Sequence, residues 1–146
     1  MAVRKETTRQ QFTEAARPLL EHGEQVVAGT LGRTGPSPWL SSAFGLLGFA
    51  VFALFGLRFY YLLVTDRRVL WLKASMTGRP AGLAFADPRT SVGVAGIRKG
   101  AAWSRLGVTR PDGRRLTLHV HRAWRDDMEA VAEALGGTPD RQPAAR

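Results

Sequence analysis

Cysteine is absent from this sequence of 146 residues, and its absence excludes a disulfide framework, a thiolate zinc site and a thiol nucleophile. The first twelve residues, MAVRKETTRQQF, have no apolar core behind their charges and no small-residue cleavage site. We therefore expect no secretory signal and an N-terminus that stays in the cytosol. The length predicts a single domain that is held together by packing alone.

Patterns typical of catalysis are also missing. The sequence contains no Gly-x-Ser-x-Gly elbow and no phosphate-cradling glycine loop before a helix. Asp126 and Asp127 are adjacent on a predicted helix, so their side chains diverge. His119 and His121 share one face of a predicted strand, but no recognised metal-binding spacing supplies a third ligand. We interpret the two histidines as polar residues on the outer face of that strand, and we expect no enzymatic activity, no metal and no cofactor.

Positive charge is concentrated in the later part of the chain. The net charge is +9 in total, of which residues 1–38 contribute +1 and residues 58–146 contribute +8. We expect this positive charge to contact an anionic membrane surface rather than nucleic acid. No basic recognition helix is predicted, and the last predicted helix is acidic on its exposed face. An equally good interpretation is purely structural: the arginine side chains cover the edges of the sheet with their apolar stems and keep their charged groups in water. The candidate contacts for an anionic lipid or a protein partner are Arg58, Arg67, Arg68, Arg98, Lys99 and Arg105.

A long apolar run lies in the first half of the sequence. Trp39 to Leu57 are 19 residues without a charge, which as a helix would extend about 28 Å, close to the roughly 30 Å of a bilayer's hydrocarbon layer. All faces of such a helix are apolar, which indicates lipid contact or burial between subunits. We predict a hydrophobic helical insertion over residues 38–57. Its candidate membrane-contacting residues are Trp39, Leu40, Phe44, Leu47, Phe49, Phe52, Phe55 and Leu57.

The charges that follow limit how far a membrane could extend. A charged side chain near the bilayer centre costs about 2.5 to 3.5 kcal/mol, so the apolar layer must end before Asp66, most simply at Arg58. The basic bias after Leu57 favours a globular part on the cytoplasmic side of the cell membrane.

The remaining sequence alternates between short strands and turns. Residues 24–32 predict a strand, and residues 59–65 and 69–73 predict a hairpin around the turn Asp66-Arg67-Arg68. Further short strands are predicted within residues 83–91, 92–100, 101–109 and 115–120. A Pro-Asp-Gly turn within residues 110–114 precedes the last of them.

Helices are predicted at both ends. Residues 1–23 form an N-terminal amphipathic helix whose apolar stripe runs through Phe12, Ala16, Leu19 and Leu20, with Pro18 bending or ending it. From Trp124 to Leu135 a continuous apolar stripe predicts a second amphipathic helix. Residues 137–146 are predicted to be a disordered tail.

The strands, the last helix and the stretch YLLVTDRRVLWL together resemble the bacterial pleckstrin-homology-like (PH-like) domains, many of which carry a similar strand, Thr-Asp-Arg-Arg turn and strand beside transmembrane segments. The likeness covers residues 24–136, interrupted by residues 38–57. It implies an α+β fold, in which a bent antiparallel barrel or sandwich of about seven strands is closed by the C-terminal helix. It also implies adaptor work, in which the domain binds lipids, peptides or partner subunits.

The position of the insertion raises a topological question. A single full crossing between residues 24–32 and 59–65 would leave these two strands on opposite sides of a membrane. The apolar segment could dip into one leaflet and turn near residues 45–48, the first strand could lie outside the barrel, or the segment could pack against other copies. We expect a membrane-anchored adaptor with a cytoplasmic PH-like domain; the alternative is a soluble, self-assembling scaffold that buries residues 39–57 between subunits.

Overall fold

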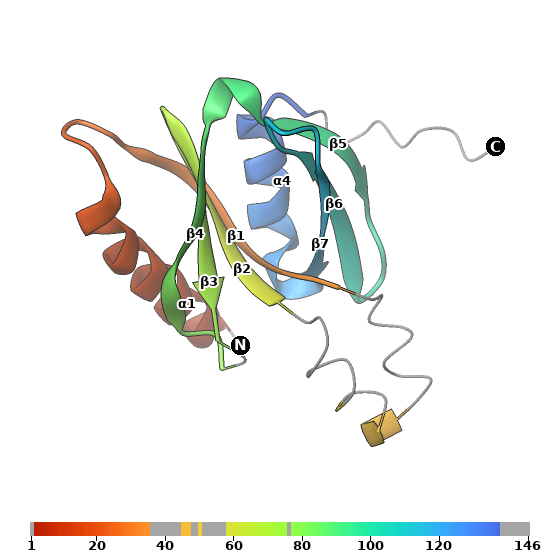
Figure 1. The fold of residues 1–146 in the computed structure, drawn as a ribbon. Helices are drawn as coiled ribbons and strands as arrows, with labels where there is room; N and C mark the ends of the chain where they lie inside the picture. Colours follow the sequence, from red (N-terminus) through yellow and green to blue (C-terminus); the bar gives the residue numbers. More distant parts are fainter. Residues whose placement is uncertain (1, 36–44, 48–49, 51–57, 76, 138–146) are drawn as a thin grey trace.

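The computed structural model of the chain describes residues 2–35, 45–47, 50, 58–75 and 77–137. Two helices and a seven-stranded antiparallel sheet make up this part, so the predicted α+β class is confirmed (Figure 1). The helices are α1 (Ala2–Ala16) and α4 (Arg125–Ala134), and the short 3-10 turns are Arg17–Leu19, Arg89–Ser91 and Arg122–Trp124. The strands are β1 (Val26–Thr34), β2 (Arg58–Thr65), β3 (Arg68–Ala74), β4 (Pro80–Pro88), β5 (Gly93–Arg98), β6 (Trp103–Thr109) and β7 (Arg115–His121).

The sheet consists of two hairpin-connected halves that meet at one residue pair. Its order is β4-β3-β2-β1-β7-β6-β5. β1 pairs with β2 along nearly its whole length, from Val26 opposite Thr65 to Thr34 opposite Arg58. β1 and β7, by contrast, pair only at Arg33 and His119. The two halves therefore diverge from that point, and α4 packs into the space between them, chiefly against β1.

The sheet curls strongly but does not close, so the expectation of a closed barrel was wrong. Its curl brings the end of β4 to the turn between β6 and β7, where Arg110 donates to both carboxylate oxygens of Asp87 at 2.8 and 3.1 Å. The guanidinium of Arg110 also lies 4.0 Å from the ring centre of Phe85. This contact joins the two halves by side chains rather than by a ladder of backbone hydrogen bonds.

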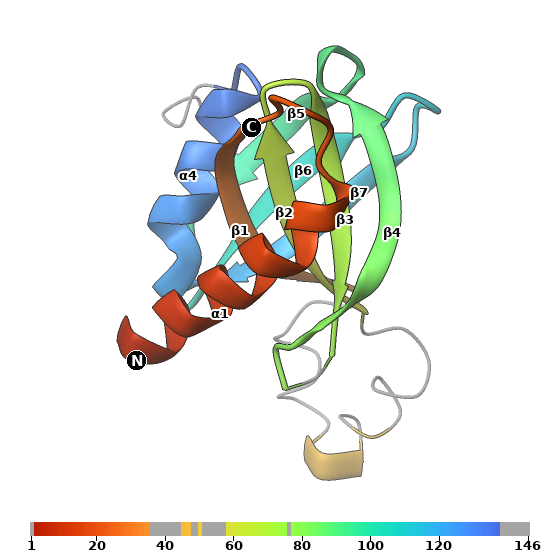
Figure 2. The same ribbon diagram turned by 90° about the vertical axis from the view of Figure 1, so that its left-hand side faces the viewer.

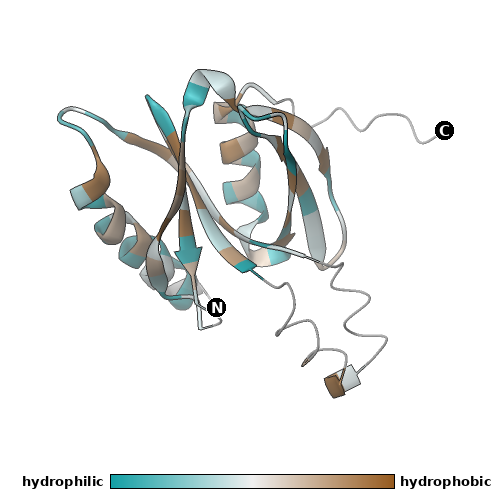
Figure 3. Ribbon diagram, in the orientation of Figure 1, coloured by the Kyte–Doolittle hydropathy of each residue, from teal (hydrophilic) through white to brown (hydrophobic). Residues whose placement is uncertain are grey.

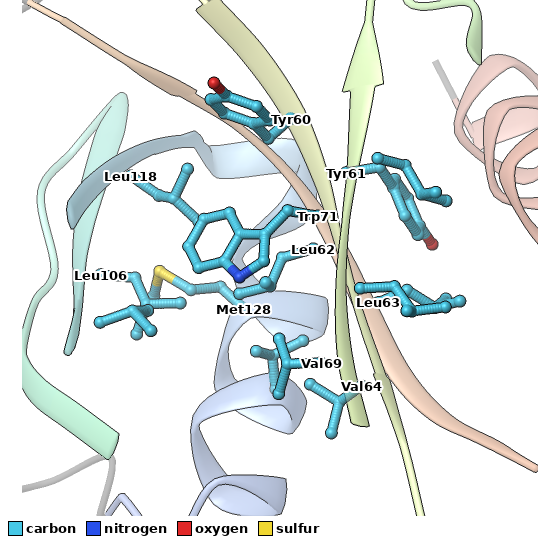
Figure 4. Packing of buried hydrophobic residues seen from close by; sticks show 14 of the residues in the cluster. Tyr60, Tyr61, Leu62, Leu63, Val64, Val69, Trp71, Leu106, Leu118 and Met128 are labelled. Carbon is cyan, nitrogen blue, oxygen red and sulfur yellow. The ribbon is translucent and has the colours of Figure 1, made fainter. Parts of the chain in front are cut away.

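The main core lies on the face of the sheet that α4 covers. Trp71 is fully buried, together with Leu62 of the neighbouring strand, Leu106 and Leu118 from the other half of the sheet and Met128 of α4 (Figure 4). Opposed residues of antiparallel strands share a face, so the pairing of Trp71 with Leu62 and of Leu106 with Leu118 builds one apolar layer. Figure 3 shows hydrophobic positions, in brown, on several strands and on α4.

α1 covers part of the opposite face of the sheet (Figure 2). Phe12 is fully buried and stacks on Tyr61 of β2 at a centroid distance of 4.5 Å. Burial raises the pKa of Tyr61 to about 12. Asp127 of α4 accepts from Arg9 of α1 at 2.5 Å and also pairs with Lys5. One aromatic stack and one shared carboxylate thus hold α1 in place.

Most predicted elements are present, with shifted ends. The 59–65 and 69–73 hairpin, the C-terminal helix and the Pro-Asp-Gly turn are confirmed, and Gly113 in that turn has a φ of +83°. α1 begins at Ala2, in agreement with the predicted range of residues 1–23, and it ends at Ala16. Pro18 lies within the 3-10 turn Arg17–Leu19 that follows, so the helix ends near this proline, as expected.

Two predicted segments fall largely outside the described residues. The tail at residues 138–146 lies outside them, and so does most of the hydrophobic insertion at residues 38–57. Within the part of the chain that the structure describes, no helix is long and apolar enough to cross a membrane.

We predict that Phe12→Ala lowers the free energy of unfolding by about 3 to 4 kcal/mol, because it removes a fully buried ring and its stacking on Tyr61. Urea denaturation measures this change. Leu83→Ala is the control: Leu83 is 38% exposed, so its truncation should cost less than about 1 kcal/mol. Equal losses in the two variants would mean that α1 does not pack on the sheet.

Candidate functional site

A cavity of about 260 Å³ lies at the end of the sheet where β1 ends and β2 begins. It is lined by the first turns of α1, by β1, by the ends of β6 and β7, and by residues 75 and 77–78 between β3 and β4. The lining residues that carry side-chain nitrogen atoms or aromatic rings include Lys5, Arg33, Trp103, His119, His121 and Trp124. Aromatic rings and nitrogen-bearing side chains therefore share one small concave site.

Arg33 is the most unusual side chain in this cavity. It is only 6% exposed, and its Nε atom has no hydrogen-bond partner. The guanidinium lies 4.8 Å from the ring centre of Trp103, a cation–π arrangement that holds its plane in place. Burial lowers the pKa of Arg33 below its ordinary value of 12.5. No ion pair joins Arg33 to a carboxylate within the described residues.

A row of basic side chains extends from Arg33 across the second half of the sheet. Arg33 on β1 lies opposite His119 on β7, His119 opposite Arg105 on β6, and Arg105 opposite Arg98 on β5. Directly opposed residues project from the same face, so these four form one strip, here called the basic row. Arg33, the first member of the row, directly precedes Thr34, which pairs with Arg58.

His119 corrects the interpretation of the two histidines as outer-face residues. It is 5% exposed, because Arg33 and Arg105 flank it in the neighbouring strands and the cavity wall covers it. Burial lowers its pKa below 6.5, and the positive charges of Arg105 and Arg33 lower it further. His119 is therefore a neutral member of the basic row at pH 7.

His121 is half-buried at the mouth of the cavity. Its Nδ1 atom accepts a hydrogen bond of 3.2 Å from the backbone N–H of Ala123. The proton of the neutral ring consequently resides on Nε2. His121 thus has a donor to offer, and its ring lies edge-on to Trp103 at 5.2 Å. Within the described residues no cluster of three His, Asp or Glu side chains could hold a metal ion.

The predicted contact residues do not form one surface. Arg98 and Arg105 belong to the basic row, and Arg58 lies at the same end of the sheet. Lys99 pairs with Glu129 of α4 at 2.8 Å. Arg67 and Arg68 lie at the opposite end of β2, where they make structural contacts.

Thr65 and Arg68 bind Glu24 in the motif that carries the PH-like resemblance. Glu24 is buried, and its carboxylate accepts from Arg68 Nη2 at 2.6 Å, from Arg68 Nε at 3.1 Å and from the Thr65 hydroxyl at 2.6 Å. The Thr65 oxygen also accepts the backbone N–H of Arg68 at 2.8 Å, which shapes the turn. Arg68, which was predicted as a candidate lipid or partner contact, therefore holds a structural ion pair in the turn.

The other two residues of the motif fix the start of β1. The backbones of Asp66 and Gln25 are joined by a 3.0 Å hydrogen bond, and the Asp66 carboxylate accepts from the backbone N–H of Gln25 at 3.0 Å. Arg67 contacts Glu21 at 3.3 Å in an exposed ion pair. The Thr-Asp-Arg-Arg sequence thus forms a structural clasp between the β2–β3 turn and the segment that precedes β1.

The predicted membrane-contacting residues fall almost entirely outside the described residues. Leu47 is the exception; it is 81% exposed, and its neighbour Leu46 is 90% exposed. The strand ends beside the segment are well defined, since Thr34 lies opposite Arg58 and its hydroxyl donates to the Arg58 carbonyl at 3.4 Å. The option in which the first strand lies outside the sheet is therefore wrong.

Arg33 and Lys5 were not among the predicted site residues. Arg33 could have been noticed because it shares the strand face of Leu31, in a strand that is otherwise apolar or small. No sequence pattern could have indicated Lys5, because its position at the cavity depends on the packing of α1.

No protein-family model matches the chain, and no curated protein matches it significantly in sequence.

Glu24 should make the stability of the fold sensitive to acid. Its contacts with Arg68, offset in part by burial and helped by Thr65, lower the pKa of Glu24 from 4.5 to about 2. A folded-state pKa below the unfolded one stabilises the protein above pH 4.5, and this contribution disappears as the pH falls toward 2. We predict a loss of about 3 kcal/mol over that range, measured by urea denaturation at a series of pH values.

Glu24→Gln should flatten this part of the pH profile and lower stability at pH 7, because the Arg68 charge loses its partner. Glu21→Gln is the matched control, since Glu21 forms an exposed ion pair that is worth less than about 1 kcal/mol. An unchanged acid transition in Glu24→Gln would contradict this assignment.

Proposed function

We propose that this protein is a non-catalytic, membrane-anchored binding module whose PH-like domain lies on the cytoplasmic side and contacts an anionic lipid surface or a protein partner. The observation that carries the proposal is the pairing of Thr34 with Arg58. The uncharged segment between them begins and ends at the same end of the sheet. A segment that returns to its starting side can enter a membrane while both flanking strands stay in one folded domain.

The distribution of charge supports the same orientation. The basic row lies beside the Thr34–Arg58 pair, and Arg58 itself is exposed. Each basic residue near an anionic leaflet contributes about 1 kcal/mol of attraction. At the opposite end of β2, acidic side chains offset the basic charge: Glu24 binds Arg68, and Asp66 accepts from the backbone N–H of Gln25. One end of the sheet therefore presents basic charge where the apolar segment emerges.

The number of secondary-structure elements supports the PH-like part of the proposal. The resemblance implies about seven antiparallel strands and one C-terminal helix, and the sheet and α4 supply these elements. The sheet is open rather than closed, and the helix packs against β1 at the gap. Binding rather than catalysis is proposed because none of the described cavity hydroxyls is hydrogen-bonded to a His, Asp or Glu side chain, and the Thr65 hydroxyl that donates to Glu24 belongs to a buried structural contact.

Replacing residues 36–57 by a short turn should release the protein from the membrane without unfolding it. Thr34 and Arg58 are already neighbours, so a loop of about two to four residues can join the strands. We expect the full chain to sediment with membranes and to require detergent, and the variant to be a folded, soluble monomer. Recovery of the full chain as a detergent-free monomer would overturn the proposal. A detergent-free oligomer that becomes monomeric in the variant would establish the self-assembling scaffold instead.

Single cysteines placed before and after the segment should react from the same side of a membrane. Gln25→Cys and Lys73→Cys are suitable, because both positions are exposed and the chain has no cysteine of its own. A membrane-impermeant maleimide applied to inside-out vesicles should label both variants, and applied to right-side-out vesicles should label neither. Labelling of the two positions from opposite sides would contradict the paired β1 and β2 strands.

A further inference from the structure

We propose that the cavity centred on Arg33 is a binding site for a phosphate group. The inference goes beyond membrane anchoring, since it concerns a defined pocket in the folded domain. The site would exist whether the segment at residues 36–57 enters a membrane or not.

The first argument is the unpaired charge of Arg33. A guanidinium stays protonated in proteins, and this one is 6% exposed, with Nε unpartnered and no ion pair to a described carboxylate. Burying an ion without a counter-ion is costly. Stacking on Trp103 offsets only part of this cost. An anion in the cavity would supply both the missing charge and the missing hydrogen-bond acceptors.

The second argument is the composition of the cavity wall. Its described lining includes Arg4, Lys5 and Arg33 but no Asp or Glu. Lys5 shares the Asp127 carboxylate with Arg9, and no described carboxylate pairs with Arg33 or with the exposed Arg4. In the sequence, the segment at residues 36–57 that follows β1 has no acidic residue either. Among the described residues that line the cavity, no side chain carries a negative charge that could replace an external anion.

The third argument concerns which anion fits. Arg33 offers a planar fork of N–H groups, which matches phosphate geometry. His121 offers Nε2–H from β7, and the hydroxyls of Ser75 and Thr77, 2.8 Å apart, line a third wall. Donors from three directions suit a tetrahedral oxyanion better than a planar carboxylate. A volume of about 260 Å³ accommodates a phosphate with a short ester group and is below the usual range for larger ligands.

Two sources could supply this group: the headgroup of a phosphate-bearing lipid, or a small soluble phosphate compound. The test measures the thermal melting of the full chain in nonionic-detergent micelles at constant ionic strength. Inorganic phosphate is titrated in one arm. In a second arm the micelles contain phosphatidic acid, and in a third they contain phosphatidylcholine, in which the phosphate is shielded by choline.

We expect inorganic phosphate to raise the melting temperature saturably in the wild type. Arg33→Gln should weaken the apparent affinity at least about tenfold, because a charge-assisted hydrogen bond is lost. Arg98→Gln is the matched control: it makes the same change of charge in the basic row, but Arg98 does not line the cavity. It should leave the apparent affinity within about twofold of the wild type, since its charge is exposed and screened.

A stabilisation by phosphatidic acid that depends on Arg33 and is absent with phosphatidylcholine would assign the site to a lipid headgroup. A response to inorganic phosphate alone would assign it to a soluble compound. The proposal is overturned if neither probe stabilises the wild type, or if Arg33→Gln responds as the wild type does. It is also overturned if Arg98→Gln loses as much affinity as Arg33→Gln.

A second variant guards against a folding defect in Arg33→Gln. His121→Asn keeps an acceptor for the Ala123 N–H but removes the Nε2–H donor. We expect its melting temperature without phosphate to equal that of the wild type and its phosphate affinity to fall several-fold. An unchanged affinity in this variant, together with an unfolded Arg33→Gln, would also count against the site. Membrane sedimentation of His121→Asn should remain as in the wild type, because His121 lies outside the basic row, and this separates failure of the phosphate site from failure of the membrane anchor.

Discussion

The clasp between Glu24 and the β2–β3 turn sets the register on which the rest of the molecule depends. Arg68 and Thr65 bind the Glu24 carboxylate, and Gln25 bonds to Asp66, so the first residue of β1 has one position relative to β2. A shift of one residue would turn every side chain of β1 to the other face. The clasp at one end therefore favours the register of β1 against β2 in which Thr34 meets Arg58 at the other end.

Two of the buried charges of the domain, Glu24 and Arg33, differ in how they are compensated. Glu24 has a guanidinium and a hydroxyl within hydrogen-bonding distance, and its lowered pKa reflects these partners. Arg33 is buried to a similar degree and stacks on the Trp103 ring, but no described carboxylate pairs with it. The first arrangement is complete within the protein, as a structural ion pair has to be. The second is incomplete, and incomplete polar groups in a cavity are where a ligand gains the most from binding.

Local patterns in the sequence predicted the fold better than they predicted the site. The 59–65 and 69–73 hairpin and the C-terminal helix follow from alternation and helical spacing within a few residues, and these were confirmed. Arg33, Lys5 and His119 come together through the pairing of distant strands and the docking of α1. His119 lies on the polar face of its strand in sequence, but Arg33 and Arg105 of the neighbouring strands flank it and it is buried in the lining of the cavity. Burial of this kind depends on tertiary structure and leaves no local periodicity to detect.

The adjacency of Thr34 and Arg58 also bears on how such a chain can change over evolutionary time. The entropy cost of closing a loop rises only logarithmically with its length, by about 0.6 kcal/mol for each doubling. With the strand ends held together by their own hydrogen bonds, segments of very different length and hydropathy can connect them at little cost to the sheet. The sequence between β1 and β2 can therefore vary in length and composition while the packed core of the domain stays the same.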